Sequence, residues 1–396
     1  IFTTNTYIPL LLVNIVFVFT MVLLKDVLVT PILGINNSLI FILMLLIVAF
    51  DGLWSIPMVL LRADNAPFKY LTFTVTNVVS NITFIYFFFI VLQLGIVGIV
   101  FSNVLSSCLL FIISFPVVLR KISLNSLEMG VFKKLFKFGS PFIFAGIFSM
   151  VIELSDRYII KYLLNIEMVG VYNAGYKLGM LMLLIVMGFN MAWQPYFLDK
   201  KNNNTNILES TTNNVWITFS FLCGAMICFI EPISKINVFG HTLIGSEFTE
   251  SLVIVPLICL GYLFHGAYIL QLPGPFLTGK TYYVALIRGA GAVSNIALNF
   301  ILIPVYGIEG AAVATLLSFV IMSIMLLAVN RKIFPLNYNV YGIMCTVIVL
   351  LFYILVIKTN PGTHIRLIMI MMMPVLFFLL GCFDVNQILT KIKYRK

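Results

Sequence analysis

The chain consists of long apolar segments separated by short polar ones. A run of about 20 apolar residues is long enough to cross the ~30 Å hydrocarbon core as a helix. Lipid offers no partner to a free backbone N–H or C=O, so such spans must be helical. The pattern predicts an all-α polytopic membrane protein with twelve transmembrane helices. They are expected at residues 8–24, 38–60, 70–92, 95–119, 138–160, 168–192, 213–230, 251–271, 281–303, 308–329, 339–357 and 365–381.

Composition and charge agree with this pattern. Only 10% of the 396 residues are charged, whereas a soluble protein carries about 25%. If the first residues are cytoplasmic, sixteen of the 24 Lys and Arg residues fall in loops on the cytoplasmic side, as the positive-inside rule requires. Both chain ends are then expected in the cytoplasm. The same bias accounts for the net charge of +10 without a nucleic-acid partner.

Five short motifs recur in the same order, 211 to 214 residues apart. This offset contains six predicted helices, an even number, so both copies cross the membrane in the same direction, as in parallel-repeat transporters. The pairs are Phe50-Asp51-Gly52 with Phe264-His265-Gly266, Tyr70 with Tyr283, Val79-Ser80-Asn81 with Val293-Ser294-Asn295, Gly95-Ile96-x-Gly98 with Gly307-Ile308-x-Gly310, and Arg120-Lys121 with Arg331-Lys332.

The repeat also predicts helices outside the sequence. The second copy opens with KFGSPFIFAG at residues 137–146, and its counterpart would precede Ile1. We therefore expect two further helices before Ile1 and fourteen in the intact protein. The predicted divisions are an N-lobe at 1–125, a C-lobe at 126–335, and a C-terminal helix pair with a basic tail at 336–396.

Three segments carry a resemblance to a known family. They are KFGSPFIFAG, SDRYIIKYLLNIEMVGVYNAGYKLG (155–179) and FNMAWQPYF (189–197). Together they resemble the Wzx-type polysaccharide flippases of the multidrug/oligosaccharidyl-lipid/polysaccharide exporter superfamily. The resemblance implies a fourteen-helix protein of the bacterial cytoplasmic membrane that moves an undecaprenyl-diphosphate-linked oligosaccharide to the outer leaflet. It also implies membrane lipids, a polysaccharide polymerase and glycosyltransferases as partners, and O-antigen or capsule synthesis as the process.

Four charged residues cluster in the predicted span at 138–160 and just beyond it. At 100° per residue, Glu153, Asp156, Arg157 and Lys161 fall within an arc of about 140° on one helix face. One interpretation is that this face lines a hydrated substrate pathway, as ionisable residues at membrane depth usually do. The other is that Glu153 and Arg157 neutralise each other while Lys161 reaches the interface.

Two further cations lie inside predicted spans. Lys177 is about 13 Å deep, with no acid three or four residues away. It either lines the substrate pathway or pairs with an acid of another helix, such as Glu153 or Asp156. Arg288 lies about 10 Å inside the cytoplasmic end of its span. It either extends back to that surface or helps to load the diphosphate.

Asp51 and His265 occupy matching positions of the repeat. Such positions are where coupling groups gather in repeat transporters, so both are candidates for proton or ion coupling. The alternative for Asp51 is a buried hydrogen bond to a helix end. The alternative for His265 is a core histidine bonded to a neighbouring carbonyl.

Enzyme and cofactor signatures are absent from the sequence. There is no GxxxxGK[ST] or HExxH motif, and the six cysteines lack metal-binding spacing, so no cofactor or metal is predicted. A membrane polymerase or ligase would need a catalytic constellation, and the outward loop at about 231–250 shows none. The competing transport function is a cation-coupled multidrug exporter of the same superfamily.

Overall fold

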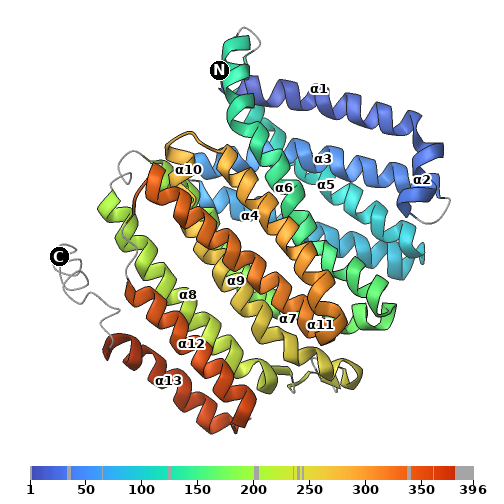
Figure 1. Cartoon of the computed structure of the whole chain (residues 1–396). Helices are drawn as coiled ribbons and strands as arrows, with labels where there is room; N and C mark the ends of the chain where they lie inside the picture. The colour runs from blue at the N-terminus through green and yellow to red at the C-terminus, as the bar shows by residue number, and fades with distance from the viewer. Residues whose placement is uncertain are drawn as a thin grey trace. The chain divides into compact units, whose positions relative to one another are not determined.

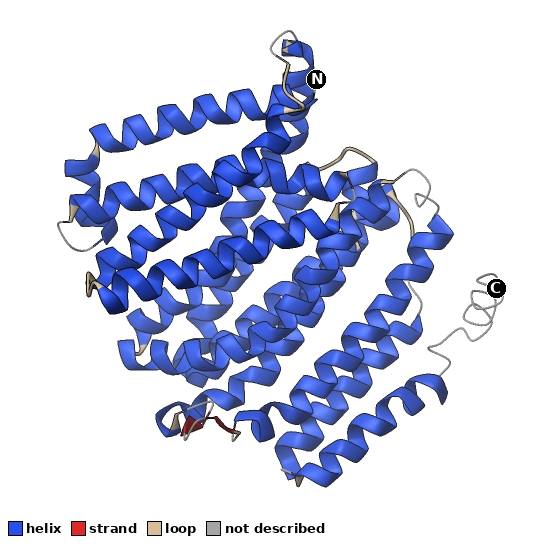
Figure 2. Ribbon diagram, turned by 180° about the vertical axis from the view of Figure 1, so that it is seen from behind, coloured by secondary structure: helices blue, strands red, loops and turns tan. Residues whose placement is uncertain are grey.

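A computed structural model describes most of the chain. The described residues are 2–33, 37–64, 66–123, 126–199, 205–234, 236–238, 241–242, 245–336, 340–359 and 361–379. They are almost entirely helical (Figures 1 and 2), which confirms the all-α polytopic prediction. The chain divides into two compact units, Ile1–Lys137 and Phe138–Lys396. The predicted lobe boundaries stay predictions.

Unit 1 is built on α3, which packs against α1 and α5, while α4 packs against α5. A π-helix, η1, continues α4 without a break. Its elements are α1 (Phe2–Leu23), α2 (Lys25–Leu33), α3 (Ser38–Ala63), α4 (Pro67–Ile85), η1 (Tyr86–Val91) and α5 (Gly95–Leu119). The chain then enters α6 (Met129–Leu163), which continues into unit 2.

Unit 2 is centred on α9, which packs against α7, α8 and α11. On its other side α8 packs against the last two helices, α12 and α13, which run beside it in Figure 1. Its elements after α6 are α7 (Ile166–Leu198), α8 (Thr205–Ser234), the strand pair β1 (Asn237–Val238) and β2 (His241–Thr242), the 3₁₀ helix η3 (Ser246–Ile254), α9 (Val255–Leu270), α10 (Pro273–Leu277), α11 (Tyr282–Ile333), α12 (Val340–Thr359) and α13 (Thr363–Leu379).

Each predicted span coincides with helix over its described residues, apart from single residues at the ends of four spans. Nine helices in the described part of the chain are long and apolar enough to cross a membrane, and two shorter apolar helices follow near the C-terminal end. One of the nine, α11, has 52 residues and consists of two successive helices. Its backbone breaks at Gly307, between the spans expected at 281–303 and 308–329. The number of crossings in the intact protein stays a prediction.

The internal repeat has a backbone signature in both units. Gly95 and Gly307 have positive φ angles of 58° and 57°, a region that glycine enters without steric cost. Three residues on, a Cβ on Gly98 would lie 2.9 Å from the Phe88 carbonyl oxygen, and one on Gly310 would lie 2.4 Å from that of Leu302. The matched Gly-Ile-x-Gly motifs therefore form the same tight turn, with helices in close contact.

Replacing Gly310 with alanine should destabilise the protein because no space exists for its methyl group. Forcing a methyl into a packed contact costs about 1–3 kcal/mol. Thermal unfolding in detergent should show a clearly lower midpoint for Gly310→Ala. The matched control is Gly146→Ala in α6, where a Cβ meets nothing within 4 Å. Equal midpoints for the two variants would contradict the close contact.

A buried ion pair fixes α13 to α8. The Arg366 guanidinium lies 2.5 Å from the Glu231 carboxylate and also donates to the carbonyls of Cys228 and Pro361. Arg366 is only 3% exposed. Its charge is balanced by Glu231, and its N–H groups donate to the protein rather than to solvent. The last described helix is thus bound to the core of unit 2 by polar bonds as well as by apolar packing.

Candidate functional site

The most deeply buried charge of unit 2 is Asp156 on α6, which is 0% exposed. One carboxylate oxygen, Oδ2, accepts hydrogen bonds from the Tyr172 hydroxyl at 2.5 Å and the Thr315 hydroxyl at 3.2 Å. The other oxygen, Oδ1, is buried with no hydrogen-bond partner among the described residues. Asp156 therefore joins three helices, α6, α7 and α11, through one half of its carboxylate.

Arg157 supplies the charge next to this carboxylate. Its guanidinium lies 3.9 Å from Asp156 and is only 19% exposed. It donates to Asn173 at 3.0 Å and to the Glu153 backbone carbonyl, and its Cζ lies 4.1 Å from the Tyr176 ring centroid, a cation–π distance. These contacts hold Arg157 against α7.

The network extends through neutral side chains into the interior of unit 2. Asn295 donates to Thr315 at 3.4 Å and accepts from Ser155 at 2.8 Å and from Asn299 at 3.0 Å. Asn295 and Asn299 are both 0% exposed, and the Asn299 Oδ1 has no partner among described residues. Buried polar groups left unpaired are costly, so this interior cluster is unusual for an apolar bundle.

Arg288 forms a second polar centre on α11. Its guanidinium donates to the Ser149 hydroxyl at 2.8 Å, the Ala145 carbonyl at 3.4 Å and the Tyr268 hydroxyl at 3.3 Å. All of these partners are neutral, and none of the described residues forms a salt bridge with it. The side chain is thus held among α6, α9 and α11 with its charge uncompensated.

His265 packs in the aromatic interior of unit 2. Its ring stacks on Tyr268 with centroids 6.0 Å apart and lies 5.0 Å from the Phe319 ring. Nδ1 is buried with no hydrogen-bond partner among the described residues, so the carbonyl bond considered for it is not formed at this nitrogen. Its coupling role stays a prediction.

The four charged residues expected on one face of α6 differ in exposure. Lys161 is exposed, Glu153 and Arg157 are partly buried, and Asp156 is completely buried. No Glu153–Arg157 salt bridge appears among the described residues, because Arg157 bonds the backbone carbonyl of Glu153 and lies beside Asp156 instead. The alternative of a self-neutralised Glu153–Arg157 pair is therefore not supported.

Lys177 is exposed on α7, one turn beyond Asn173. It makes no hydrogen bond or ion pair within the described part of the chain, so the predicted alternative of pairing with Glu153 or Asp156 is not seen. Its helix face is otherwise apolar and exposed, as Leu181 and Leu184 show. Lys177 is therefore a free cation within a membrane-length helix.

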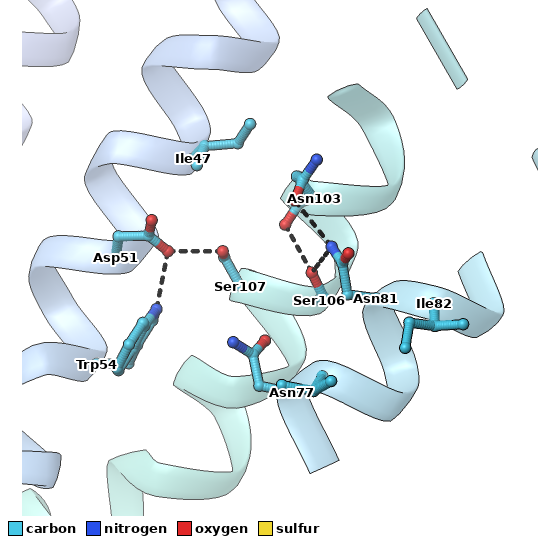
Figure 3. Close-up of a pocket in the computed structure, with 10 residues that line it drawn as sticks. Ile47, Asp51, Trp54, Asn77, Asn81, Ile82, Asn103, Ser106 and Ser107 are labelled. Carbon is cyan, nitrogen blue, oxygen red and sulfur yellow. Dashed lines mark hydrogen bonds between the residues drawn. The ribbon is translucent and has the colours of Figure 1, made fainter. Parts of the chain in front are cut away.

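Asp51 anchors a polar cluster in unit 1 (Figure 3). Its Oδ1 accepts from the Ser107 hydroxyl at 2.6 Å and the Trp54 indole N–H at 2.8 Å. Beside it, the Asn81 side-chain amide donates to Asn103 at 2.8 Å and to Ser106 at 2.9 Å. The alternative considered for Asp51, a buried hydrogen bond to a helix end, is not seen among the described residues, because its bonds are made to side chains and are partly buried. Its coupling role stays a prediction.

One side-chain hydrogen bond occurs at equivalent positions of the sequence repeat in both units. Asn81 contacts Asn103 in unit 1, and Asn295 contacts Thr315 in unit 2. The paired positions are 214 and 212 residues apart, the offsets of the sequence repeat. This equivalence was not expected from the sequence, although isolated polar residues within apolar helices could have identified it.

The arrangement of helices is similar to that of two solved structures. An outward-facing multidrug resistance MATE family transporter of the MOP superfamily aligns with a TM-score of 0.71 and 13% identity, over 83% of this chain and 77% of that one. The lipid II flippase MurJ in an inward closed conformation aligns with a TM-score of 0.64 and 16% identity, over 98% of this chain and 84% of that one. At such identities the likeness concerns the fold alone.

The sequence comparison then gives the family. The model of the family described as polysaccharide biosynthesis protein matches residues 1–201, half of the chain, and the chain belongs to that family. A putative O-antigen transporter of Shigella flexneri is 24% identical over 236 residues, 58% of this chain and 53% of that protein. The chain thus spans about half the length of this curated relative. The resemblance to polysaccharide flippases is confirmed, and these relatives are transporters rather than enzymes.

Proposed function

We propose that this protein is a flippase of the bacterial cytoplasmic membrane that moves undecaprenyl-diphosphate-linked oligosaccharides from the inner to the outer leaflet by alternating access. The observation that most supports this proposal is the uncompensated positive charge of Arg288 and Lys177 within membrane-length helices. A cation at the centre of a membrane helix costs about 2.5–3.5 kcal/mol or more. A diphosphate offers the charge-assisted hydrogen bonds that would offset this cost.

The remaining polar groups fit the same task. A sugar crossing hydrocarbon would leave hydroxyls unpaired, each at a cost of several kcal/mol. Neutral amides and hydroxyls deep in both units provide a route for such groups. Asp51 and His265 stay candidates for ion coupling, and both chain ends are proposed to lie in the cytoplasm, with the polymerase and glycosyltransferases of polysaccharide synthesis as partners.

Deleting the gene in its native bacterium tests this function. We expect loss of surface polysaccharide and accumulation of the lipid-linked repeat unit in the cytoplasmic membrane, both restored by the intact gene. The competing exporter function predicts normal surface polysaccharide and increased sensitivity to cationic dyes. That result would overturn the flippase proposal.

A further inference from the structure

A cavity of about 320 Å³ lies within unit 1 among α3, α4 and α5 (Figure 3). Its polar lining includes Asp51, Trp54, Asn77, Asn81 and Asn103. Asp51, Asn81 and Ser107 each sit near the middle of a membrane-length helix. A volume above ~300 Å³ is within the range of small-molecule sites. The cavity thus places a concentration of polar groups at membrane depth.

Several of these groups have hydrogen-bonding capacity that the described residues do not use. Asp51 uses Oδ1 for both of its bonds and leaves Oδ2 open. Asn81 uses only its amide nitrogen, which leaves its oxygen as a free acceptor. The Asn77 side chain makes no hydrogen bond with any described residue, and its Oδ1 is buried. Two open acceptors, the Asp51 Oδ2 and the Asn81 Oδ1, and the Asn77 NH₂ donor therefore lie at the cavity without partners among the described residues.

The residues that line the cavity indicate which class of ligand it can bind. None of the cavity's lining residues in the described chain is Lys or Arg, so nothing there would attract a diphosphate, and Asp51 would repel it. A bare metal ion fits poorly, because the described residues offer no group of three His, Cys, Asp or Glu side chains and the cavity is large. A sugar ring fits this lining better. Its hydroxyls can donate to the free amide and carboxylate oxygens, and its C–H groups can pack against the Trp54 indole.

We propose that this cavity binds a sugar residue of the lipid-linked substrate. The inference rests on the proposed function. It assigns the glycan and the diphosphate of the substrate to side chains of different chemistry. Neutral amides, the Asp51 carboxylate and the Trp54 indole of unit 1 bind the glycan. The uncompensated cations of unit 2, Lys177 and Arg288, bind the diphosphate. Specificity for the repeat unit is then set in the cavity, whereas the carrier is recognised through its charge.

Binding to the intact protein in lipid nanodiscs tests this division. The two radiolabelled probes are the lipid-linked repeat unit extracted from the gene-deletion strain and undecaprenyl diphosphate without sugar. Asn77→Leu should weaken binding of the glycan-bearing probe roughly tenfold or more, as expected for losing one or two hydrogen bonds. Binding of undecaprenyl diphosphate should not change. Because Asn77 makes no side-chain bond within the described structure, this variant removes no visible internal contact.

Two controls complete the design. Thr83→Val changes an exposed side chain of the same helix that bonds only the Val79 carbonyl, and it should bind both probes normally. Lys177→Ala should weaken both probes. Asn77→Ala removes the same amide without adding a larger side chain. Unfolding midpoints measured for every variant show whether the leucine variant is misfolded.

The outcomes separate the two proposals. Unchanged glycan-probe binding in both Asn77 variants, with Lys177→Ala weakening both probes, would overturn the sugar site and leave the flippase function standing. A sodium-dependent change in tryptophan fluorescence of the unaltered protein that is lost in both Asn77 variants, together with unchanged binding of the glycan probe, would assign the cavity to an ion and also overturn the sugar site. If neither probe binds the unaltered protein, the proposed function itself fails.

Discussion

Replacing Lys177 with alanine is expected to reduce polysaccharide export to the level of a strain that lacks the gene. The side chain is exposed and unpaired within the described structure, so its removal breaks no internal contact. It does remove a cation that the described helices place at membrane depth without a counter-charge, where a diphosphate could bind it. Surface polysaccharide on immunoblots is the measurement, with protein abundance in the membrane measured in parallel.

The chain offers matched controls for this variant. Lys161→Ala removes another exposed cation, at the end of α6, and Leu181→Ala shortens a side chain one turn from Lys177 on the same face. Both should export normally, whereas Lys177→Arg should retain part of the activity because the charge remains. Normal surface polysaccharide in the Lys177→Ala strain would remove Lys177 from the substrate pathway.

Replacing Asp156 with alanine is expected to destabilise unit 2 by about 3–5 kcal/mol, the range for removing one partner of a buried charge pair. The change leaves the Tyr172 hydroxyl without its 2.5 Å acceptor, Thr315 without one of its partners, and Arg157 without the nearby carboxylate. Thermal unfolding in detergent should show a large decrease in midpoint. Export should fall with the amount of folded protein.

Two further variants separate hydrogen bonding from charge at this site. Asp156→Asn keeps an acceptor for Tyr172 and should be less destabilising than alanine. Glu153→Gln alters a carboxylate one turn away that makes no side-chain hydrogen bond among the described residues, and it should change stability by less than ~1 kcal/mol. Equal losses for Asp156→Ala and Glu153→Gln would contradict the central position of Asp156.

Arg157 and Arg288, both in unit 2, are held in different electrical environments. Arg157 has a carboxylate 3.9 Å away, so most of its charge is balanced within the protein. Arg288 has only hydroxyl and carbonyl partners, which orient the guanidinium without neutralising it. Arg288 is therefore the better candidate for an anionic ligand, and Arg157 the better candidate for maintaining the contact between α6 and α7.

The sequence by itself determined the helical membrane architecture and its repeat. Apolar run length and the need to satisfy backbone hydrogen bonds within each segment are local properties, so the predicted spans fall on helix over nearly all of their described residues. The Gly95 and Gly307 turns were detectable for the same reason, because a positive φ is a local requirement that glycine meets.

Only the tertiary structure decided what each polar side chain does. Helical spacing placed Asp156 and Arg157 on one face, yet packing against α7 and α11 buried the first completely and left the second partly exposed. The cavity beside Asp51 needed side chains from α3, α4 and α5, which are separated by tens of residues. The rotation of each helix about its axis depends on its neighbours' side chains, so local periodicity could identify the polar residues but not their partners.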